Sequence, residues 1–555
     1  MRPALVLLLS AVAGGAFMYG SEPADLILIN GAVTTLDPAQ PTAAAVAVRA
    51  DHIIYVGSDP EALALKGPAT RVVDLKGRAV VPGFTDAHGH ISGLGFAIER
   101  LDLTGTTSAR QIAKLVRDRA KDLPSGQWIT GRGWDQNDWN RQEFPTRADL
   151  DAAAPDHPVA LERIDGHAIW ANSRAIQIAG VTAATADPAG GQILRDVAGA
   201  PTGIFVDNAE GLIMERVAPP TRGQTKNALT RAMTRCLESG LTEVHDAGVS
   251  AQDLEIYREL LVDGDFPFRV YAMLSNEPSL LEAHLTAGPQ IGLGSGRLTV
   301  RAIKAYLDGA LGSRGAALLA PYRDDSGNVG LVRTEPKVVR SLAERAARGG
   351  FQLCIHAIGD RGCRLALDAL EAGIAASPGR DHRFRVEHAQ VLAPEEIPRF
   401  GRLGIIASMQ PTHATSDMYW AEERLGPERV RGAYAWRRLL SSGARLACGS
   451  DFPVESEKPL LGFYAAVTRQ DAKGWPEGGW FPDQRLTREE ALKCFTLDAA
   501  YAAFEESTRG SIVAGKLADL TVLSADIMSI PAAAILKTSV EMTIVGGRIA
   551  YERSR

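Results

Sequence analysis

Apolar runs of strand length alternate with amphipathic stretches of helix length through most of this chain, and this alternation constrains the fold more than any other feature. Eight apolar runs stand out: Ala79–Phe84, Leu241–Val244, Phe268–Met273, Leu298–Leu307, Gln352–Ile355, Arg383–Val386, Gly404–Met409 and Arg445–Cys448. Helical stretches such as Lys337–Arg348 and Cys363–Ala376 lie between them. The pattern predicts an α/β fold, a (β/α)8 TIM-type barrel, whose chemistry lies at the C-terminal ends of its strands.

Both ends of the chain are β-rich and lack helical periodicity. Residues 24–80 contain short apolar runs, and the Asn30-Gly31 pair between two of them is a strong hairpin signal. Residues 512–553 show the same pattern of short apolar runs, with a Gly546-Gly547 turn between two of them. We expect the two ends to form one composite β-sandwich domain beside the barrel.

The barrel is expected over residues 81–511, with a long interruption. Residues from about 93 to 236 contain two further strand-like runs, Trp128–Gly131 and Val159–Glu162. We predict that this interval is an insertion after the first barrel strand.

The N-terminus has the order of a secretory signal. Arg2 precedes the apolar stretch Ala4–Phe17, and polar sequence begins at Ser21. The apolar core of about 14 residues is shorter than the roughly 20 that span a bilayer. We predict a signal peptide over residues 1–20, a periplasmic or secreted protein and no membrane span after cleavage. An uncleaved anchor is the alternative, because Met18-Tyr19-Gly20 is a poor cleavage site.

Composition excludes some functions. The net charge is −6 and the charges are well mixed, so the chain lacks the basic stripe that nucleic-acid binding requires. The five cysteines are too scattered for a disulfide framework, and their odd number leaves at least one thiol free within the chain. Cys354 and Cys448 lie in apolar runs and are predicted to be small buried hydrophobes.

Polar residues at the predicted strand ends indicate a metal site. His88 and His90 follow the first strand two positions apart, so in an extended segment they point the same way. His356, His388 and Asp451 follow three later strands. Because a barrel converges its strand ends on one axis, these nitrogen and oxygen ligands predict a site for zinc or a similar divalent ion.

Lys304 lies inside an apolar strand, where burial penalises its charge. It must therefore be neutralised, paired or modified. One interpretation is a carbamate formed with CO₂, which could bridge two metal ions. The alternative is an ion pair with Asp308 or Glu387.

From about Ala24 to Tyr551 the chain resembles the amidohydrolase superfamily, and within it the YtcJ-like amidohydrolase-3 group that includes N-substituted formamide deformylases. The resemblance rests on ordered motifs: Pro82-Gly83-Phe84-Thr85-Asp86-Ala87-His88-Gly89-His90, Val244-His245-Asp246-Ala247-Gly248, Leu307-Asp308-Gly309-Ala310-Leu311-Gly312-Ser313-Arg314 after Lys304, His356-Ala357-Ile358-Gly359-Asp360-Arg361, Arg385-Val386-Glu387-His388-Ala389-Gln390, Gly449-Ser450-Asp451-Phe452-Pro453-Val454 and Gly515-Lys516-Leu517-Ala518-Asp519-Leu520. It implies a (β/α)8 barrel with a composite β-sandwich and a metal-dependent hydrolase.

The resemblance also implies roles for the strand-end residues. His88 and His90 would hold one metal, His356 and His388 a second, and carboxylated Lys304 would bridge two zinc ions. Asp451 would bind the first metal and move a proton from the attacking water to the departing amine; its alternative is a plain ligand. Asp86 would either orient a ligand imidazole or cap the strand end.

Three residues are candidates for substrate binding. His167, in Asp165-Gly166-His167-Ala168-Ile169-Trp170, resembles a family segment near the site. Arg314 and His245 are the other two. Simple packing is the alternative for each of them.

The sequence as a whole predicts a metal-dependent hydrolase of a non-peptide C–N bond, in a small N-substituted amide. No Gly-x-Ser-x-Gly motif occurs, which disfavours a serine hydrolase. A deaminase or a lactone or ester hydrolase on the same scaffold is one alternative, and a binding relative without catalysis is another. The expected partner is a small-molecule substrate, and the interpretation allows a homodimer.

Overall fold

The computed structural model describes residues 22–98 and 100–554. The predicted signal peptide, residues 1–20, lies outside these residues. Among the residues that are described, no helix has the length and apolar character needed to cross a membrane.

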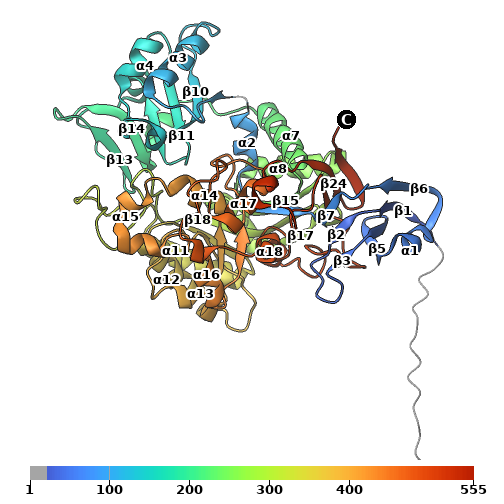
Figure 1. Cartoon of the computed structure of the whole chain (residues 1–555). Coiled ribbons are helices and arrows are strands. Elements are labelled where there is room, and N and C mark those ends of the chain that lie inside the picture. The colour runs from blue at the N-terminus through green and yellow to red at the C-terminus, as the bar shows by residue number, and fades with distance from the viewer. Residues whose placement is uncertain (1–21, 99, 555) are drawn as a thin grey trace, which may run out of the picture.

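A barrel of parallel strands forms the centre of the molecule (Figure 1). Its strands follow one another in chain order: β8 (Phe84–Gly89), β15 (Leu241–Val249), β16 (Arg269–Leu274), β18 (Leu298–Tyr306), β19 (Gln352–Ala357), β20 (Arg385–His388), β21 (Ile406–Met409) and β22 (Leu446–Cys448). Beyond β22, the Asp451 amide donates to the His88 carbonyl (2.7 Å) and the His90 amide donates to the Phe452 carbonyl (2.9 Å). These bonds join the last strand's end to the first, and the predicted barrel is confirmed.

The first predicted barrel strand, Ala79–Phe84, is wrong as one element. Residues Ala79–Pro82 form β7, which pairs with strands of the terminal sandwich, and the barrel begins only at Phe84. Between them the Gly83 amide donates to the Asp519 carbonyl, and a Cβ at Gly83 would lie 2.4 Å from the Thr242 side chain. Two consecutive buried strands give one continuous apolar run, so hydrophobicity could not separate them.

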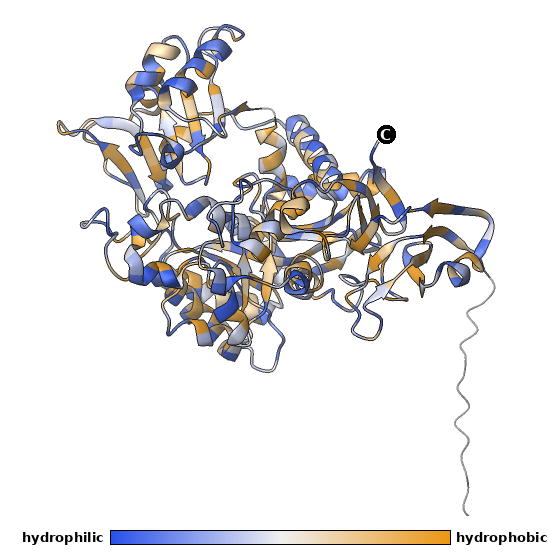
Figure 2. Ribbon diagram, viewed as in Figure 1, coloured by the Kyte–Doolittle hydropathy of each residue, from blue (hydrophilic) through white to orange (hydrophobic). Residues whose placement is uncertain are grey.

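Helices cover the outside of the barrel, and hydrophobic and hydrophilic residues alternate along them (Figure 2). In α11 (Pro336–Gly349), the buried residues Val339, Leu342, Ala343, Ala346 and Ala347 recur every three or four positions. This spacing places them on one helix face, which packs against α12 (Asp360–Ala376) and β19. The two predicted helices at Lys337–Arg348 and Cys363–Ala376 lie within these elements.

The chain ends form two sheets beside the barrel. The first contains β5 (His52–Gly57), β4 (Ala45–Arg49), β1 (Ala24–Ile29) and β6 (Lys66–Asp74). The second contains β25 (Arg548–Glu552), β24 (Val540–Val545), β23 (Leu520–Leu523), β7, β2 (Ala32–Thr34) and β3 (Thr42–Ala43). The second sheet therefore combines strands from both ends of the chain.

Of the two predicted turns, only the C-terminal one is a hairpin. Strands β24 and β25 pair antiparallel around Gly546-Gly547. The hairpin at Asn30-Gly31 is wrong, because β1 pairs with β4 and β6 whereas β2 pairs with β3 and β7. Asn30, at a φ of 55°, instead carries the chain from one sheet to the other. Gly546 and Gly547 both have a positive φ (55° and 72°), as a type I′ hairpin turn requires, whereas in the Asn30-Gly31 pair only Asn30 does.

The predicted insertion contains more strands than its sequence suggested. Its sheet consists of β13 (Gly191–Arg195), β14 (Pro201–Asp207), β12 (Ala168–Ala171), β11 (Val159–Arg163), β10 (Ile129–Trp134) and β9 (Leu101–Asp102). Helices α3 (Ala109–Ala120) and α4 (Arg147–Ala153) pack on it around a separate core that includes Trp134 and Trp170 (Figure 1). The chain then returns to the barrel in α7 (Arg222–Glu238), which packs against α2 (Ile91–Ala97).

One cysteine prediction is wrong. Cys448, at the end of β22, forms a disulfide with Cys494 at the end of α18 (Arg488–Cys494). The two residues are 46 positions apart, and only the packing of α18 against β22 brings them together. Cys354 is buried with a free thiol, as predicted.

Candidate active site

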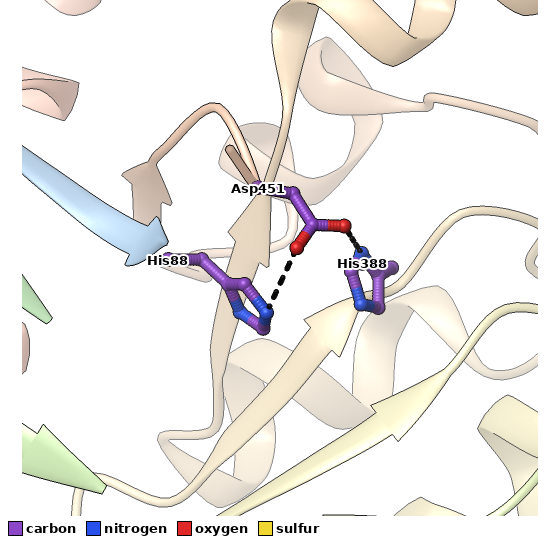
Figure 3. Close-up of side chains that lie close together, drawn as sticks. All are labelled: His88, His388 and Asp451. Atoms are coloured by element: carbon purple, nitrogen blue, oxygen red, sulfur yellow. Dashed lines mark ion pairs between the residues drawn. The ribbon is translucent and has the colours of Figure 1, made fainter. Parts of the chain in front are cut away.

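Three predicted metal ligands converge at the C-terminal end of the barrel (Figure 3). His88, His388 and Asp451 each offer a ligand atom, and these atoms lie within 4.8 Å of one another. His88 Nε2 is 3.5 Å from Asp451 Oδ1. His388 Nδ1 is 4.0 Å from Asp451 Oδ2, and because this nitrogen faces Gln410, Nε2 is the nitrogen of His388 that is left for a metal. All three residues are buried, and they come from β8, β20 and the segment after β22.

His90 completes this group from the other side. Its Nε2 lies 3.0 Å from Asp451 Oδ1, yet this carboxylate oxygen accepts no hydrogen bond with good geometry. The other ring nitrogen, Nδ1, lies 2.7 Å from the Ala247 carbonyl oxygen. A nitrogen and an oxygen that face each other without forming a hydrogen bond fit ligands directed at a shared cation.

The His88 ring is held by a carboxylate that the sequence did not single out for this role. Glu387 Oε2 lies 2.5 Å from His88 Nδ1, and both side chains are fully buried. Burial raises the pKa of Glu387, but the neighbouring His88 lowers this pKa by a larger amount, so Glu387 stays charged. Burial is the main reason why the pKa of His88 falls to about 4. A neutral imidazole held by a carboxylate is typical of a histidine that binds metal.

The two histidines assigned to a second metal lie beside each other. The rings of His356 and His388 are 4.6 Å apart between centroids, and the Gln410 side-chain oxygen lies 2.8 Å from His388 Nδ1. Burial holds the pKa of both imidazoles well below the usual value. Both rings are therefore neutral and have lone pairs for coordination.

Lys304 is buried in β18 with its Nζ 2.9 Å from His88 Nε2. Among the ion pairs of the described residues, none joins Lys304 to Asp308 or Glu387, its predicted alternative partners. Asp308 instead accepts hydrogen bonds from the backbone amides of Ala317, Ile358 and Gly359. The lysine thus lies among the candidate metal ligands without an acidic partner of the predicted kind.

Asp86 binds backbone and hydroxyl groups. Its carboxylate accepts from the His88 amide (3.1 Å), the Ser450 amide (3.0 Å) and the Ser450 hydroxyl (2.6 Å). Burial raises the pKa of Asp86 to about 7 against the effect of these donors. Of the two predicted roles, this geometry supports the structural one at the strand end, whereas Glu387 orients the imidazole.

Local backbone geometry explains how Glu387 and His388 both reach the site. Adjacent residues of a regular strand point to opposite faces. His388 has a φ of 72° and Ala389 a φ of 42°, so the alternation ends there. Asp451, with a φ of 60°, marks a similar break after β22. These residues adopt a region that non-glycine residues rarely use, as is often seen at functional sites.

A cavity of about 1250 Å³ lies over the candidate ligands, between the barrel mouth and the inserted sheet. Its wall includes His90, Lys304, His356, His388 and Asp451 from the barrel. The insertion contributes Arg132, Asp135, Glu162, Arg163 and His167. The site is therefore lined by two separately folded parts of the chain.

The three predicted substrate residues have different positions. His167 lines the cavity, and its ring centroid is 5.2 Å from that of His356. His245 is fully buried and does not line the cavity, and its Nδ1 lies 3.0 Å from an Arg385 nitrogen. Arg314 pairs with Asp324 at 2.9 Å and does not line the cavity. The structure thus brings only His167 to the site.

Sequence reasoning missed several cavity residues. Arg163 and Arg333 line the wall, as does His413, whose Nε2 lies 3.8 Å from Asp451 Oδ2. None of these three residues belongs to a motif that directly follows a predicted barrel strand. A histidine close after the strand Gly404–Met409 was the one available signal for His413.

Comparisons with known proteins agree with this architecture. The model of the amidohydrolase family matches residues 71–551. The chain is 35% identical to the putative amidohydrolase YtcJ of Bacillus subtilis over 88% of this chain and 92% of the relative. It is 31% identical to the N-substituted formamide deformylase of Arthrobacter pascens over 96% and 99%.

A solved structure is similar as well. An uncharacterized metal-dependent hydrolase from Pyrococcus horikoshii superimposes with a TM-score of 0.73 at 28% identity, over 91% of this chain and 99% of that protein. The family match covers most of the chain, and the fold and the strand-end histidines agree with it. The chain therefore belongs to the amidohydrolase family.

Proposed function

We propose that this protein is a metal-dependent hydrolase that cleaves a non-peptide C–N bond in a small N-substituted amide. The observation that carries the proposal is the convergence of His88, His388 and Asp451, of which His388 and Asp451 line one large cavity. The family and the metal-dependent hydrolase of similar fold support the reaction type. Similarity to the N-substituted formamide deformylase supports the substrate class.

The residues present fit a metal centre. His88, His90 and Asp451 would hold one zinc ion, and His356 and His388 a second, with N-carboxylated Lys304 between them. Support comes from neutral buried imidazoles and from the facing nitrogen and oxygen of His90 and Asp451. The chemistry that such ions supply when bound is activation of water at neutral pH and polarisation of a carbonyl group.

Asp451 is the proposed proton carrier. It is buried, and ring nitrogens of His88, His90 and His388 lie within 4.0 Å of its carboxylate oxygens. The charged carboxylate would accept a proton from the attacking water and then donate it to the departing nitrogen. Its backbone amide bonds to the His88 carbonyl, which holds the carboxylate at the first strand's end.

The test is a screen of N-formyl and N-acyl amines with purified, zinc-supplemented protein. We expect hydrolysis of at least one secondary amide and a loss of about 10²-fold or more in kcat for Asp451→Asn. Asp368→Asn is the matched control, because Asp368 is half exposed and pairs with Arg399 on the outside of the barrel.

Unchanged turnover in Asp451→Asn would exclude the proton role. Release of ammonia from a ring amine without amide hydrolysis would favour the deaminase alternative. Hydrolysis of lactones or esters alone would favour that alternative. Binding without turnover of any of them would favour a relative that does not catalyse a reaction.

A further inference from the structure

We infer that His167, held by Asp207, accepts a hydrogen bond from the N–H group of the substrate amide, and that the enzyme therefore selects amides that carry an N–H. This inference rests on the proposed function and names the substrate group that the inserted sheet recognises. Asp207 is then a positioning residue, because it acts through His167. Neither the barrel motifs nor the metal ligands suggested a role for Asp207.

The His167–Asp207 pair is buried and doubly connected. Asp207 Oδ1 lies 2.6 Å from His167 Nδ1, and the Asp207 amide donates to the His167 carbonyl at 3.1 Å. The side chain of Asp207 is fully buried, and that of His167 is 9% exposed. Asp207 thus holds the ring of this histidine through its carboxylate and the backbone through its amide.

The barrel leaves space for this carboxylate. A Cβ on Gly309 would lie 2.4 Å from Asp207 Oδ2, and one on Gly315 would lie 2.3 Å from the same oxygen. Both glycines follow β18, the strand that carries Lys304. Any larger side chain at either position would displace the carboxylate, so two parts of the chain are shaped around Asp207.

Asp207 also adopts an unusual backbone conformation. Its φ is 51° and its ψ is −125°, at the end of β14. A non-glycine residue in this conformation is strained, and the surrounding contacts must offset the strain. Asp207 Oδ2 is buried and accepts no hydrogen bond among the described residues. A strained residue whose buried oxygen forms no hydrogen bond lowers the stability of the fold, so a purely structural role does not account for it.

The hydrogen bond to Asp207 determines which ring nitrogen of His167 carries the proton. A carboxylate can only accept, so in the neutral ring the proton lies on Nδ1 and Nε2 keeps its lone pair. No hydrogen bond within the described residues engages Nε2, and His167 lines the cavity beside His356. When this ring is neutral, the cavity wall beside His356 therefore presents a hydrogen-bond acceptor.

A secondary amide bound with its carbonyl toward the metal ligands has one further polar group, its N–H. An acceptor beside His356 complements this group. A tertiary amide has no such donor and would leave Nε2 without a partner, which is costly for a side chain that is only 9% exposed. This contrast gives the proposed selectivity its physical basis.

The experiment compares a secondary amide with its N-methyl tertiary analogue, using zinc-loaded wild-type protein and three variants. His167→Asn retains a donor near the Nδ1 position but lacks a group at Nε2. His167→Gln extends to the Nε2 position and offers an oxygen acceptor there. Asp207→Asn presents an amide N–H that favours the opposite tautomer, as the corresponding change of Asp to Asn does in the serine protease triad.

We expect wild-type protein to prefer the secondary amide by about tenfold or more in kcat/KM. His167→Asn and Asp207→Asn should bring this ratio close to one, and His167→Gln should retain more of it than His167→Asn. Metal content, measured by elemental analysis, should be the same in all four proteins. If Asp207→Asn does not fold, the two His167 variants still decide the question.

Equal losses for both amides in His167→Asn would assign a structural role to the pair and overturn the inference. Loss of one metal equivalent in His167→Asn would make His167 a metal ligand and overturn it as well. A wild-type protein that hydrolyses neither amide overturns the proposed function, an outcome distinct from an unchanged ratio.

Discussion

The candidate ligand imidazoles at the barrel mouth are oriented through their second ring nitrogen. The pairs are His88 with Glu387, His90 with the Ala247 carbonyl, and His388 with Gln410. Each contact selects a tautomer and a ring orientation before any ligand binds. Of these partners only Glu387 is charged, so it has the largest effect on its ring.

Glu387→Gln tests this effect. The substitution keeps the shape of the side chain but removes its charge, so the ring nitrogen of His88 becomes a weaker ligand. We expect metal affinity to fall by about 10- to 100-fold. Metal retained after dialysis against graded chelator concentrations measures the change.

Glu395→Gln is the matched control, because Glu395 is 63% exposed and pairs with Arg364 at the surface. It should retain wild-type metal affinity. Equal affinity in Glu387→Gln and wild-type protein would show that the buried carboxylate does not tune the site.

The strand ends carry the site, and the elements behind them hold those ends in place. Strand β22 leads to Asp451, and its last residue, Cys448, is joined to α18 by the disulfide with Cys494. The bond therefore anchors the end of the last barrel strand three positions before the proposed proton carrier. Disulfides persist in oxidising compartments, which favours the same location as the predicted signal peptide.

Removal of this bond should destabilise the protein. Cys494→Ala opens a loop of 46 positions, and we expect the free energy of unfolding to fall by about 2–4 kcal/mol. The midpoint of unfolding in guanidinium chloride, measured without reductant, gives the change.

A thiol titration of denatured, unreduced protein provides the complementary measurement. It should find three free thiols, those of Cys236, Cys354 and Cys363. Five reactive thiols would contradict the disulfide. Cys363→Ala is the control for the mutation itself, because that thiol is buried and free.

The cavity is built by the barrel and the inserted sheet together. The barrel supplies the candidate metal ligands, and the insertion supplies His167 and charged residues such as Arg163. Each part has its own hydrophobic core. Chemistry and substrate recognition are therefore assigned to different parts of the fold, and a bound metal would stabilise the barrel.

Metal removal tests this stabilisation. A ligand that binds only the folded protein adds about 2.7 kcal/mol when its free concentration is 100 times its Kd. Dialysis against a chelator should therefore lower Tm and abolish hydrolysis, and added zinc should restore both. Differential scanning calorimetry and elemental analysis measure the two effects.

His90→Asn removes a candidate ligand whose side chain is 28% exposed, so it should weaken metal binding without disturbing the core. Chelation should therefore shift the Tm of this variant less than that of wild-type protein. The same Tm in chelator and in zinc would argue against a metal centre of the proposed kind.

Local patterns in the sequence were sufficient to predict the barrel and the order of its strands. Hydrophobic periodicity is a property of neighbouring residues, so it can be recognised without knowledge of the fold. The same holds for His88 and His90, whose spacing in a strand places them together, and for the strand-end positions of His388 and Asp451. Barrel geometry then brings them to one axis.

Features that depend on partners distant in sequence could not be read in this way. The Asn30-Gly31 turn connects two sheets, and Cys448 meets Cys494, only because of strand pairing and helix packing. Glu387 orients His88, and Asp207 holds His167, across long separations in the chain. A contact between distant residues is selected by the packing of the whole fold, and no pattern of adjacent residues encodes it.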